Sequence, residues 1–159
     1  MTAGHKLGVT EFATPSDMEI VITRLVEAPR EQVFDAWTKP EHVTRWMLGP
    51  DGYSMPVCEI DLRPGGAWHF VWRGPGGHEL SMDGEYRDVA RPERLVATES
   101  WGGDWPETVN TLVLTEEAGR TTVTQTTLFP SLEARDAALE TGIKTGMTLS
   151  FNRLAAYLA

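Results

Sequence analysis

The sequence predicts an α+β fold in which a curved antiparallel sheet of six or seven strands surrounds one long C-terminal helix. Between residues 55 and 128, apolar and polar residues alternate in short runs, which is typical of strands with one buried face. Turns rich in glycine and proline separate these runs about every ten residues, as in an antiparallel meander. After Ser131, apolar residues recur every three or four positions, which is the spacing of one helical face.

The N-terminal segment differs in composition from the rest of the chain. Residues 1–16 mix glycine, threonine, serine and proline without a period, so we expect them to form a flexible leader. They contain no continuous apolar stretch of the kind that a secretory signal peptide needs. Residues 17–159 are expected to form a single domain, whose first strand begins near Met18.

Two short helices are expected after this first strand. Pro29 suits a first helical turn, because the N–H that it lacks would be unpaired there in any case. Phe34 and Trp37 then follow at helical spacing. Pro40 ends this helix, since the residue before a proline avoids the helical conformation. Residues 41–46 form the second helix.

The strands of the meander follow from the period of two. The last two, residues 109–116 and 121–128, are expected to form a hairpin. In the preceding strands, the residues expected to point inward are Cys58, Ile60 and Leu62, then Trp68, Phe70 and Trp72, then Leu80, Met82, Gly84 and Tyr86, and finally Leu95, Ala97, Glu99 and Trp101.

The C-terminal helix is expected to span most of residues 131–158, about 40 Å if it is unbroken. Ser131 can cap its N-terminus. Gly142 and Gly146 lie one turn apart, and each costs up to about 1 kcal/mol relative to alanine in a helix. Close packing of the helix on the sheet is one explanation, and room for a ligand or a hinge is the other. The apolar stripe consists of Leu139, Ile143, Met147, Ser150, Leu154 and Leu158.

Composition excludes several classes of protein. The formal net charge of -9 and the absence of a Lys/Arg cluster argue against nucleic-acid binding. No apolar run approaches the roughly 18 residues of a membrane span. Cys58 is the single cysteine, so an internal disulfide is excluded. We therefore expect a cytoplasmic protein with no membrane or nucleic-acid partner, and leave open whether it forms a homodimer.

A cavity is expected because a sheet bent around one helix leaves space that the helix does not fill. Three tryptophans and their aromatic neighbours are more than a core needs, and a buried indole N–H requires a partner. We therefore interpret the aromatic group as a pocket wall, with core packing as the alternative for each member. The predicted pocket lining is Phe34, Trp37, Trp46, Trp68, Phe70, Trp72, Met82, Tyr86, Glu99, Trp101, Asn110, Leu112, Gln125, Ile143, Gly146 and Met147.

Three polar members of this set, Glu99, Asn110 and Gln125, occupy strand positions where apolar residues would be expected. If they point inward, they are the polar anchors of an otherwise apolar pocket. A buried carboxylate must then be paired or stay neutral through a raised pKa. A β-bulge would instead turn them toward solvent, and the pattern alone leaves both alternatives open.

Known catalytic and metal-binding patterns do not occur. His78-Glu79 resembles the start of a zinc-protease motif, but Met82 stands where the second histidine is required. The histidines and Cys58 lack ligand spacing. His69 alternates with the tryptophans and so belongs on the outer face of the sheet. We therefore expect no metal, no cofactor and no assignable catalytic residue.

The motifs, taken in order, resemble the START-like (SRPBCC) helix-grip superfamily, and in particular its branch of activator of heat-shock-protein-90 ATPase homologues. The resemblance covers roughly residues 17–158. The residues that carry it are Glu27-Ala28-Pro29, Val33-Phe34-Asp35-Ala36-Trp37-Thr38, Pro40-Glu41-His42, Arg45-Trp46, Asp61-Leu62-Arg63-Pro64-Gly65-Gly66, Arg73-Gly74-Pro75, Gly77, Gly84-Glu85-Tyr86 and Arg91-Pro92-Glu93-Arg94-Leu95-Val96.

The resemblance implies the helix-grip fold and three alternative functions. The favoured one is non-enzymatic binding of a small hydrophobic or aromatic molecule, in stress response or secondary metabolism. The second is an enzyme of cyclase, hydrolase or self-sacrifice resistance type that uses the same cavity. The third is an adaptor that activates a chaperone ATPase, which is the weakest because a fold does not carry function.

Overall fold

The computed structural model describes residues 7–102 and 105–159 and has the expected α+β architecture. Strands β2 to β8 and the helices follow the predicted order, and one further strand precedes them. The elements are β1 (Thr10–Ala13), β2 (Glu19–Val26), α1 (Arg30–Thr38), α2 (Pro40–Trp46), β3 (Ser54–Ile60), β4 (Ala67–Arg73), the 3-10 turn η1 (Pro75–Gly77), β5 (Glu79–Ala90), β6 (Arg94–Glu99), β7 (Thr108–Glu117), β8 (Arg120–Leu128), α3 (Leu132–Leu139) and α4 (Ile143–Leu158).

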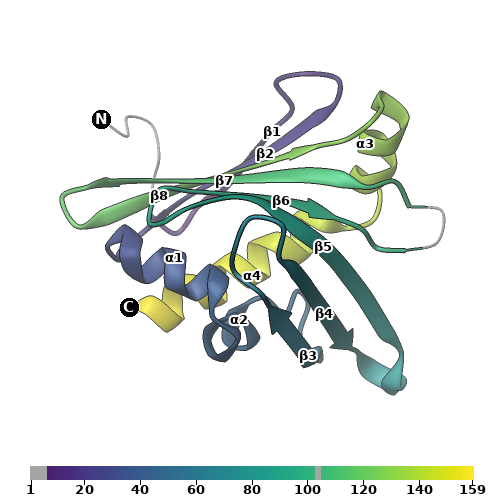
Figure 1. Cartoon of the computed structure of the whole chain (residues 1–159), viewed down its shortest axis with the longest axis horizontal. Helices are drawn as coiled ribbons and strands as arrows, with labels where there is room; N and C mark the ends of the chain where they lie inside the picture. Colours follow the sequence, from purple (N-terminus) through teal and green to yellow (C-terminus); the bar gives the residue numbers. More distant parts are fainter. Residues whose placement is uncertain (1–6, 103–104) are drawn as a thin grey trace.

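The strands form one antiparallel sheet in the order β1-β2-β8-β7-β6-β5-β4-β3. Figure 1 shows this sheet curving around α4, with α1 and α2 near one end and α3 at the other. β5 joins the two halves of the sheet: its first part pairs with β4, and its last part pairs with β6 after a register shift between Tyr86 and Asp88. Gly84 permits the bend, because a Cβ there would collide with the carbonyl oxygen of Thr98.

The additional strand, β1, lies inside the segment expected to be a flexible leader. It pairs with β2 from Thr10 opposite Arg24 to Ala13 opposite Val21, so that expectation is wrong for residues 10–13. Residues 1–6 lie outside the described part of the chain. β1 pairs with β2 because β2 would otherwise expose a row of unpaired backbone groups at the edge of the sheet. A run of four residues is too short for its alternation to show in the sequence.

The C-terminal helix is not continuous, which corrects the expectation of one long helix. α3 and α4 are separated at Gly142, whose φ of 79° is a left-handed conformation that favours glycine. Ser131 caps α3 as expected, with its Oγ accepting a hydrogen bond from the Ala134 N–H at 3.1 Å. The break lets α3 turn away from α4 toward the end of the sheet (Figure 1).

The buried core extends along the concave face of the sheet and includes the side chains under the C-terminal half of α4. Phe151 and Leu154 are fully buried there, and the ring of Trp46 stacks on Phe151 with centroids 6.1 Å apart. Trp46 also donates its indole N–H to the carbonyl of Ala36 at 2.8 Å, which joins α2 to α1. By contrast, Ile143 and Met147 in the N-terminal half of α4 are only partly buried. Of the predicted stripe, only Ser150 and Leu154 are therefore buried, and Met147 packs against the core from a partly buried position.

Candidate ligand-binding cavity

The space beside the N-terminal half of α4 is a cavity of about 640 Å³ between this helix, α3 and the concave face of the sheet. Gly146 borders it, and a Cβ at this position would meet only Pro50, at 3.8 Å. Close helix–sheet packing is therefore not the reason for this glycine. A larger side chain at Gly146 would extend into the cavity.

Aromatic side chains form one wall of the cavity. β4 presents Trp68, Phe70 and Trp72 on its concave face, with ring centroids 4.8 Å apart for the first pair and 5.8 Å for the second. Trp101 stacks on Trp72 with a centroid distance of 5.5 Å and an interplanar angle of 27°. It is 46% exposed, which places it at the mouth of the cavity. The wall thus continues from the interior to the entrance.

The indole nitrogens of this wall differ in their partners. Trp72 donates its N–H to the carbonyl oxygen of Met47 at 2.7 Å, so the loop between α2 and β3 orients the ring. The indole nitrogen of Trp68 is buried and has no hydrogen-bond partner among the described residues. The atom is enclosed by the protein, so this unsatisfied donor costs about 1–3 kcal/mol of stability.

A strip of polar side chains crosses the opposite wall on β6, β7 and β8. Glu99 lies opposite Thr108 in the sheet, and Asn110 lies opposite Thr127. The Asn110 amide donates to Glu99 Oε2 at 3.0 Å and to Thr127 Oγ1 at 3.3 Å, and the Thr108 hydroxyl donates to Glu99 Oε1 at 3.5 Å. These side chains point inward, which resolves the alternative of a solvent-facing strip.

The environment of Glu99 changes its acidity. Burial raises the pKa of its carboxyl group to about 7, and the hydrogen bonds from Asn110 and Thr108 only partly oppose this rise. Near neutral pH the group is therefore divided between its neutral and charged forms. Gln125, also on the strip, has a buried Oε1 atom without a hydrogen-bond partner among the described residues.

Most predicted pocket residues lie around this cavity, although whether they bind a ligand stays a prediction. Phe34 and Trp46 do not line it: both are fully buried, and Trp46 packs with Trp37 and Phe151 under α4. That part of the prediction is corrected, because helical spacing cannot tell a core face from a pocket face. The predicted residues that do line the cavity are Trp37, Trp68, Phe70, Trp72, Met82, Tyr86, Glu99, Trp101, Asn110, Leu112, Gln125, Ile143, Gly146 and Met147.

Many of the lining residues that the prediction missed come from loops and from α3. The α2–β3 loop contributes residues 47–50 and Tyr53, and α3 contributes Ala134 and Ala138. The connection before β7 contributes Trp105 and Pro106. Thr108 and Thr127 could have been found from their strand positions, since each lies two residues from a predicted lining residue or directly opposite one.

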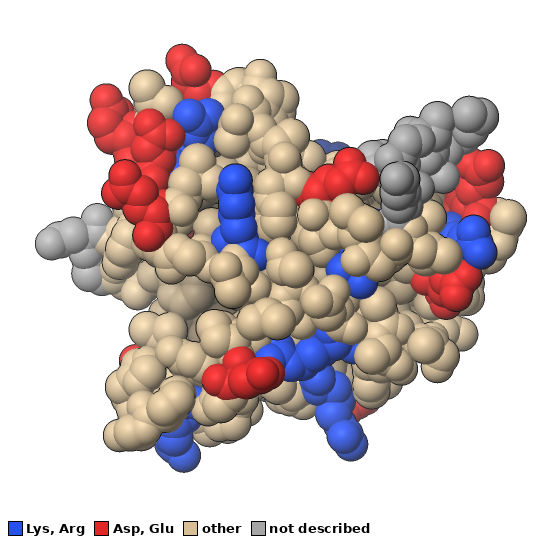
Figure 2. Space-filling model, turned by 180° about the vertical axis from the view of Figure 1, so that it is seen from behind, with Lys and Arg blue, Asp and Glu red and all other residues tan. Residues whose placement is uncertain are grey.

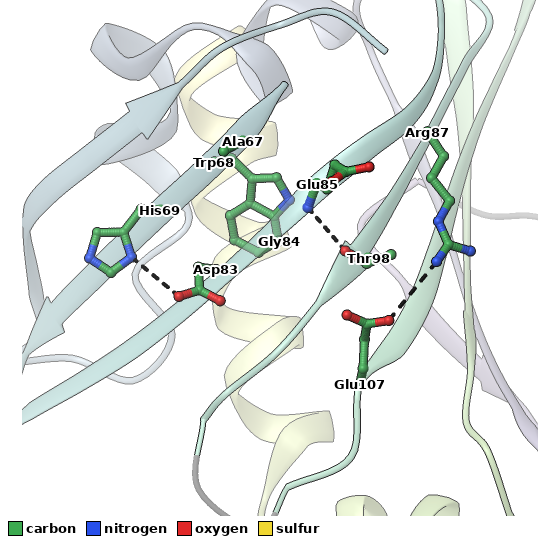
Figure 3. Close-up of a pocket in the computed structure, with 9 residues that line it drawn as sticks. All are labelled: Ala67, Trp68, His69, Asp83, Gly84, Glu85, Arg87, Thr98 and Glu107. Atoms are coloured by element: carbon green, nitrogen blue, oxygen red, sulfur yellow. Dashed lines mark hydrogen bonds and ion pairs between the residues drawn. The ribbon is translucent and has the colours of Figure 1, made fainter. Parts of the chain in front are cut away.

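A second, shallower hollow lies on the outer face of the sheet, where His69 was expected. Figure 3 shows its charged side chains already facing one another: His69 Nδ1 lies 4.0 Å from Asp83, and Arg87 lies 3.9 Å from Glu107. Trp68 lies between this hollow and the cavity. The groups here are exposed and paired, so this hollow is the weaker candidate for a site.

The remaining surface offers few alternatives within the described residues. They contain no cluster of three His, Cys, Asp or Glu side chains suited to a metal ion. No helix in the described chain is long and apolar enough to cross a membrane. Figure 2 shows a face on which few side chains are charged, and most of the acidic groups there lie beside basic ones. The aromatic cavity is therefore the principal candidate site.

A curved antiparallel sheet closed over a C-terminal helix, with a cavity between them, defines a helix-grip protein. The family model described as Activator of Hsp90 ATPase homolog 1-like protein matches residues 27–159, and the chain belongs to this family. No curated protein matches the sequence.

Solved structures agree with this assignment. A protein from Rhodobacter sphaeroides is 27% identical with a TM-score of 0.87, and the match covers 94% of this chain and 97% of that one. A protein from Mycobacterium smegmatis is 24% identical with a TM-score of 0.85, covering 95% and 97%. An AHSA1-like protein from Aeromonas hydrophila is 22% identical with a TM-score of 0.74, covering 89% and 96%. The last two show the fold alone.

Proposed function

We propose that this protein binds a small hydrophobic or aromatic molecule in the cavity between the sheet and α4. The observation that carries the proposal is the cavity itself: about 640 Å³, with an aromatic wall and a short polar strip. Ligand sites are typically mostly apolar cavities of about 300–1,000 Å³ with a few polar groups that fix orientation. A cytoplasmic location and a role in stress response or secondary metabolism remain predictions.

The entrance supports the same proposal. Leu80, Trp101 and Trp105 border the cavity and are 44%, 46% and 48% exposed. Exposed large apolar side chains that surround an opening are typical of ligand-binding grooves. A ligand entering here would cover these side chains and reach the polar strip with its far end.

A neutral solvatochromic dye, Nile red, tests the proposal. We expect saturable binding at one dye per chain, with a blue-shifted dye emission and quenched tryptophan emission because the indoles line the site. Gly146→Leu should abolish binding, since the new side chain extends into the cavity. Thr145→Leu is the matched control: Thr145 is exposed on the same helix, so the leucine there leaves the cavity open.

Thermal unfolding shows whether each variant keeps a cooperative fold. If folded Gly146→Leu protein binds Nile red as well as the wild type does, the dye site lies elsewhere and the proposal fails.

An enzymatic function is the second candidate, and the position of Glu99 is the observation that favours it. A carboxyl group with a pKa near 7 inside a cavity is suited to general acid or base catalysis. Native mass spectrometry of the protein from its own host would identify a co-purifying molecule to use as substrate. Glu99→Gln should then reduce turnover by about 10²–10⁴-fold for an enzyme. If the molecule is not turned over, the enzymatic alternative is wrong.

A further inference from the structure

The charged side chains that line the cavity are all acidic. Among the described residues, no Lys, Arg or His lines it, whereas Glu79 and Glu99 both do. Glu79 lies at the exposed rim, where Arg73 binds its carboxylate at 2.8 Å. Glu99 lies inside and accepts hydrogen bonds only from the neutral groups of Asn110 and Thr108. The interior carboxylate is thus left without a cationic partner among the described residues.

This arrangement disfavours an apolar anion as the ligand. The carboxylate of a fatty acid or an aromatic acid would be desolvated in the cavity with no cation to pair with it, and the Glu99 carboxylate would repel it. A cationic ligand is favoured instead, because a positively charged donor beside Glu99 forms a charge-assisted hydrogen bond. The net charge of -9 also attracts cations to the protein as a whole.

The aromatic wall adds to this preference. Glu99 and Trp101 are two positions apart and both border the cavity, a separation of about 7 Å along an extended chain. Trp101 stacks with Trp72, so these two indole rings border the same cavity as the carboxylate. Tryptophan is the strongest side chain for cation–π attraction.

We propose that the cavity selects an organic cation, an apolar or aromatic body bearing a protonated amine that pairs with Glu99. This inference rests on the proposed binding function and narrows its ligand class. The polar strip holds the ammonium group, and the wall of Trp68, Phe70 and Trp72 holds the body. An aromatic acid of the same size is rejected by charge although it fits by shape.

Three probes with the same naphthalene body test the charge preference: 1-naphthylmethylamine, 1-naphthylmethanol and 1-naphthoic acid. Affinities are measured by calorimetry at about pH 8, where the amine is protonated and the Glu99 carboxyl is mostly ionised. The amine should bind about 10- to 100-fold more tightly than the alcohol, as expected for a hydrogen bond to a charged group. The acid should bind most weakly.

Two variants show which carboxylate causes the preference for the amine. In Glu99→Gln the amine should bind no more tightly than the alcohol does in the same variant, since the charge is removed while the shape is kept. Glu79→Gln removes the same charge at the rim and should keep the full amine preference. Equal loss in both variants would assign the preference to long-range charge and overturn the proposed pairing.

The outcomes separate this inference from the proposed function. If the alcohol or Nile red binds but the amine binds no better than the alcohol, the cation preference is wrong and the cavity remains a neutral-ligand site. Tightest binding of the acid leads to the same conclusion. If neither Nile red nor any of the three probes binds, the proposed function itself fails.

Discussion

Glu99 should make the stability of the fold depend on pH, and the structure gives both the sign and the size. The pKa of this carboxyl is about 7 in the fold against an ordinary value of 4.5, because burial penalises its charged form. A folded-state pKa above the unfolded value means that the favourable contribution is complete below about pH 4.5. It is lost as the pH rises through about 7.

The difference between these pKa values corresponds to at most about 3 kcal/mol of unfolding free energy. Glu99→Gln removes the titrating group but keeps an oxygen that can accept from Asn110. The variant should therefore gain stability relative to the wild type as the pH rises from 5 to 8, by about 2.5 kcal/mol over that range.

Urea unfolding of both proteins at several pH values measures this relative change, and the subtraction removes the contribution of all other titrating groups. Parallel stability curves for wild type and Glu99→Gln would refute the reasoning. They would show that water reaches the carboxyl and that the cavity is not the low-polarity environment inferred above.

Three further substitutions test α4 and its N-terminal boundary. Leu154→Ala should reduce the unfolding free energy by about 2–5 kcal/mol, because Leu154 is fully buried in the core; an unchanged urea midpoint would mean that the helix packs with a different face. Gly142→Ala should cost about 1–2 kcal/mol, because the left-handed backbone there disfavours a Cβ. In contrast, Gly146→Ala should stabilise by up to about 1 kcal/mol, since this helical position has room for a methyl group. If urea unfolding shows that both glycine variants are stabilised, or that both are destabilised, the assigned break between α3 and α4 is wrong.

The sequence predicted the sheet well because period-two alternation reports directly which side of a strand is buried. Trp68, Phe70 and Trp72 lie on one concave face for this reason, and Glu99 and Asn110 follow the same alternation. The family resemblance added the order of the elements, which the structure confirms, and the family model matches residues 27–159.

Other features could not be predicted because they depend on tertiary structure. In the sequence, Gly142 does not interrupt the helical spacing of the apolar residues. Only its left-handed backbone angle shows that it separates α3 from α4. Phe34 and Trp46 share their helical spacing with Trp37, but the way α1 and α2 pack on α4 places only Trp37 at the cavity. Trp105 reaches the mouth from a connection without any periodic pattern.

Nuclear magnetic resonance of the six tryptophan indole N–H groups tests the central claim most directly, because the wall of the cavity can be observed residue by residue. Titration with 1-naphthylmethanol should shift the signals of Trp68, Trp72 and Trp101 together, with one common affinity. The signal of Trp46, which is buried in the core and does not line the cavity, should stay in place and serves as the internal control. Unchanged signals from Trp68 and Trp72 at saturating probe would contradict the assignment of this cavity as a ligand-binding site.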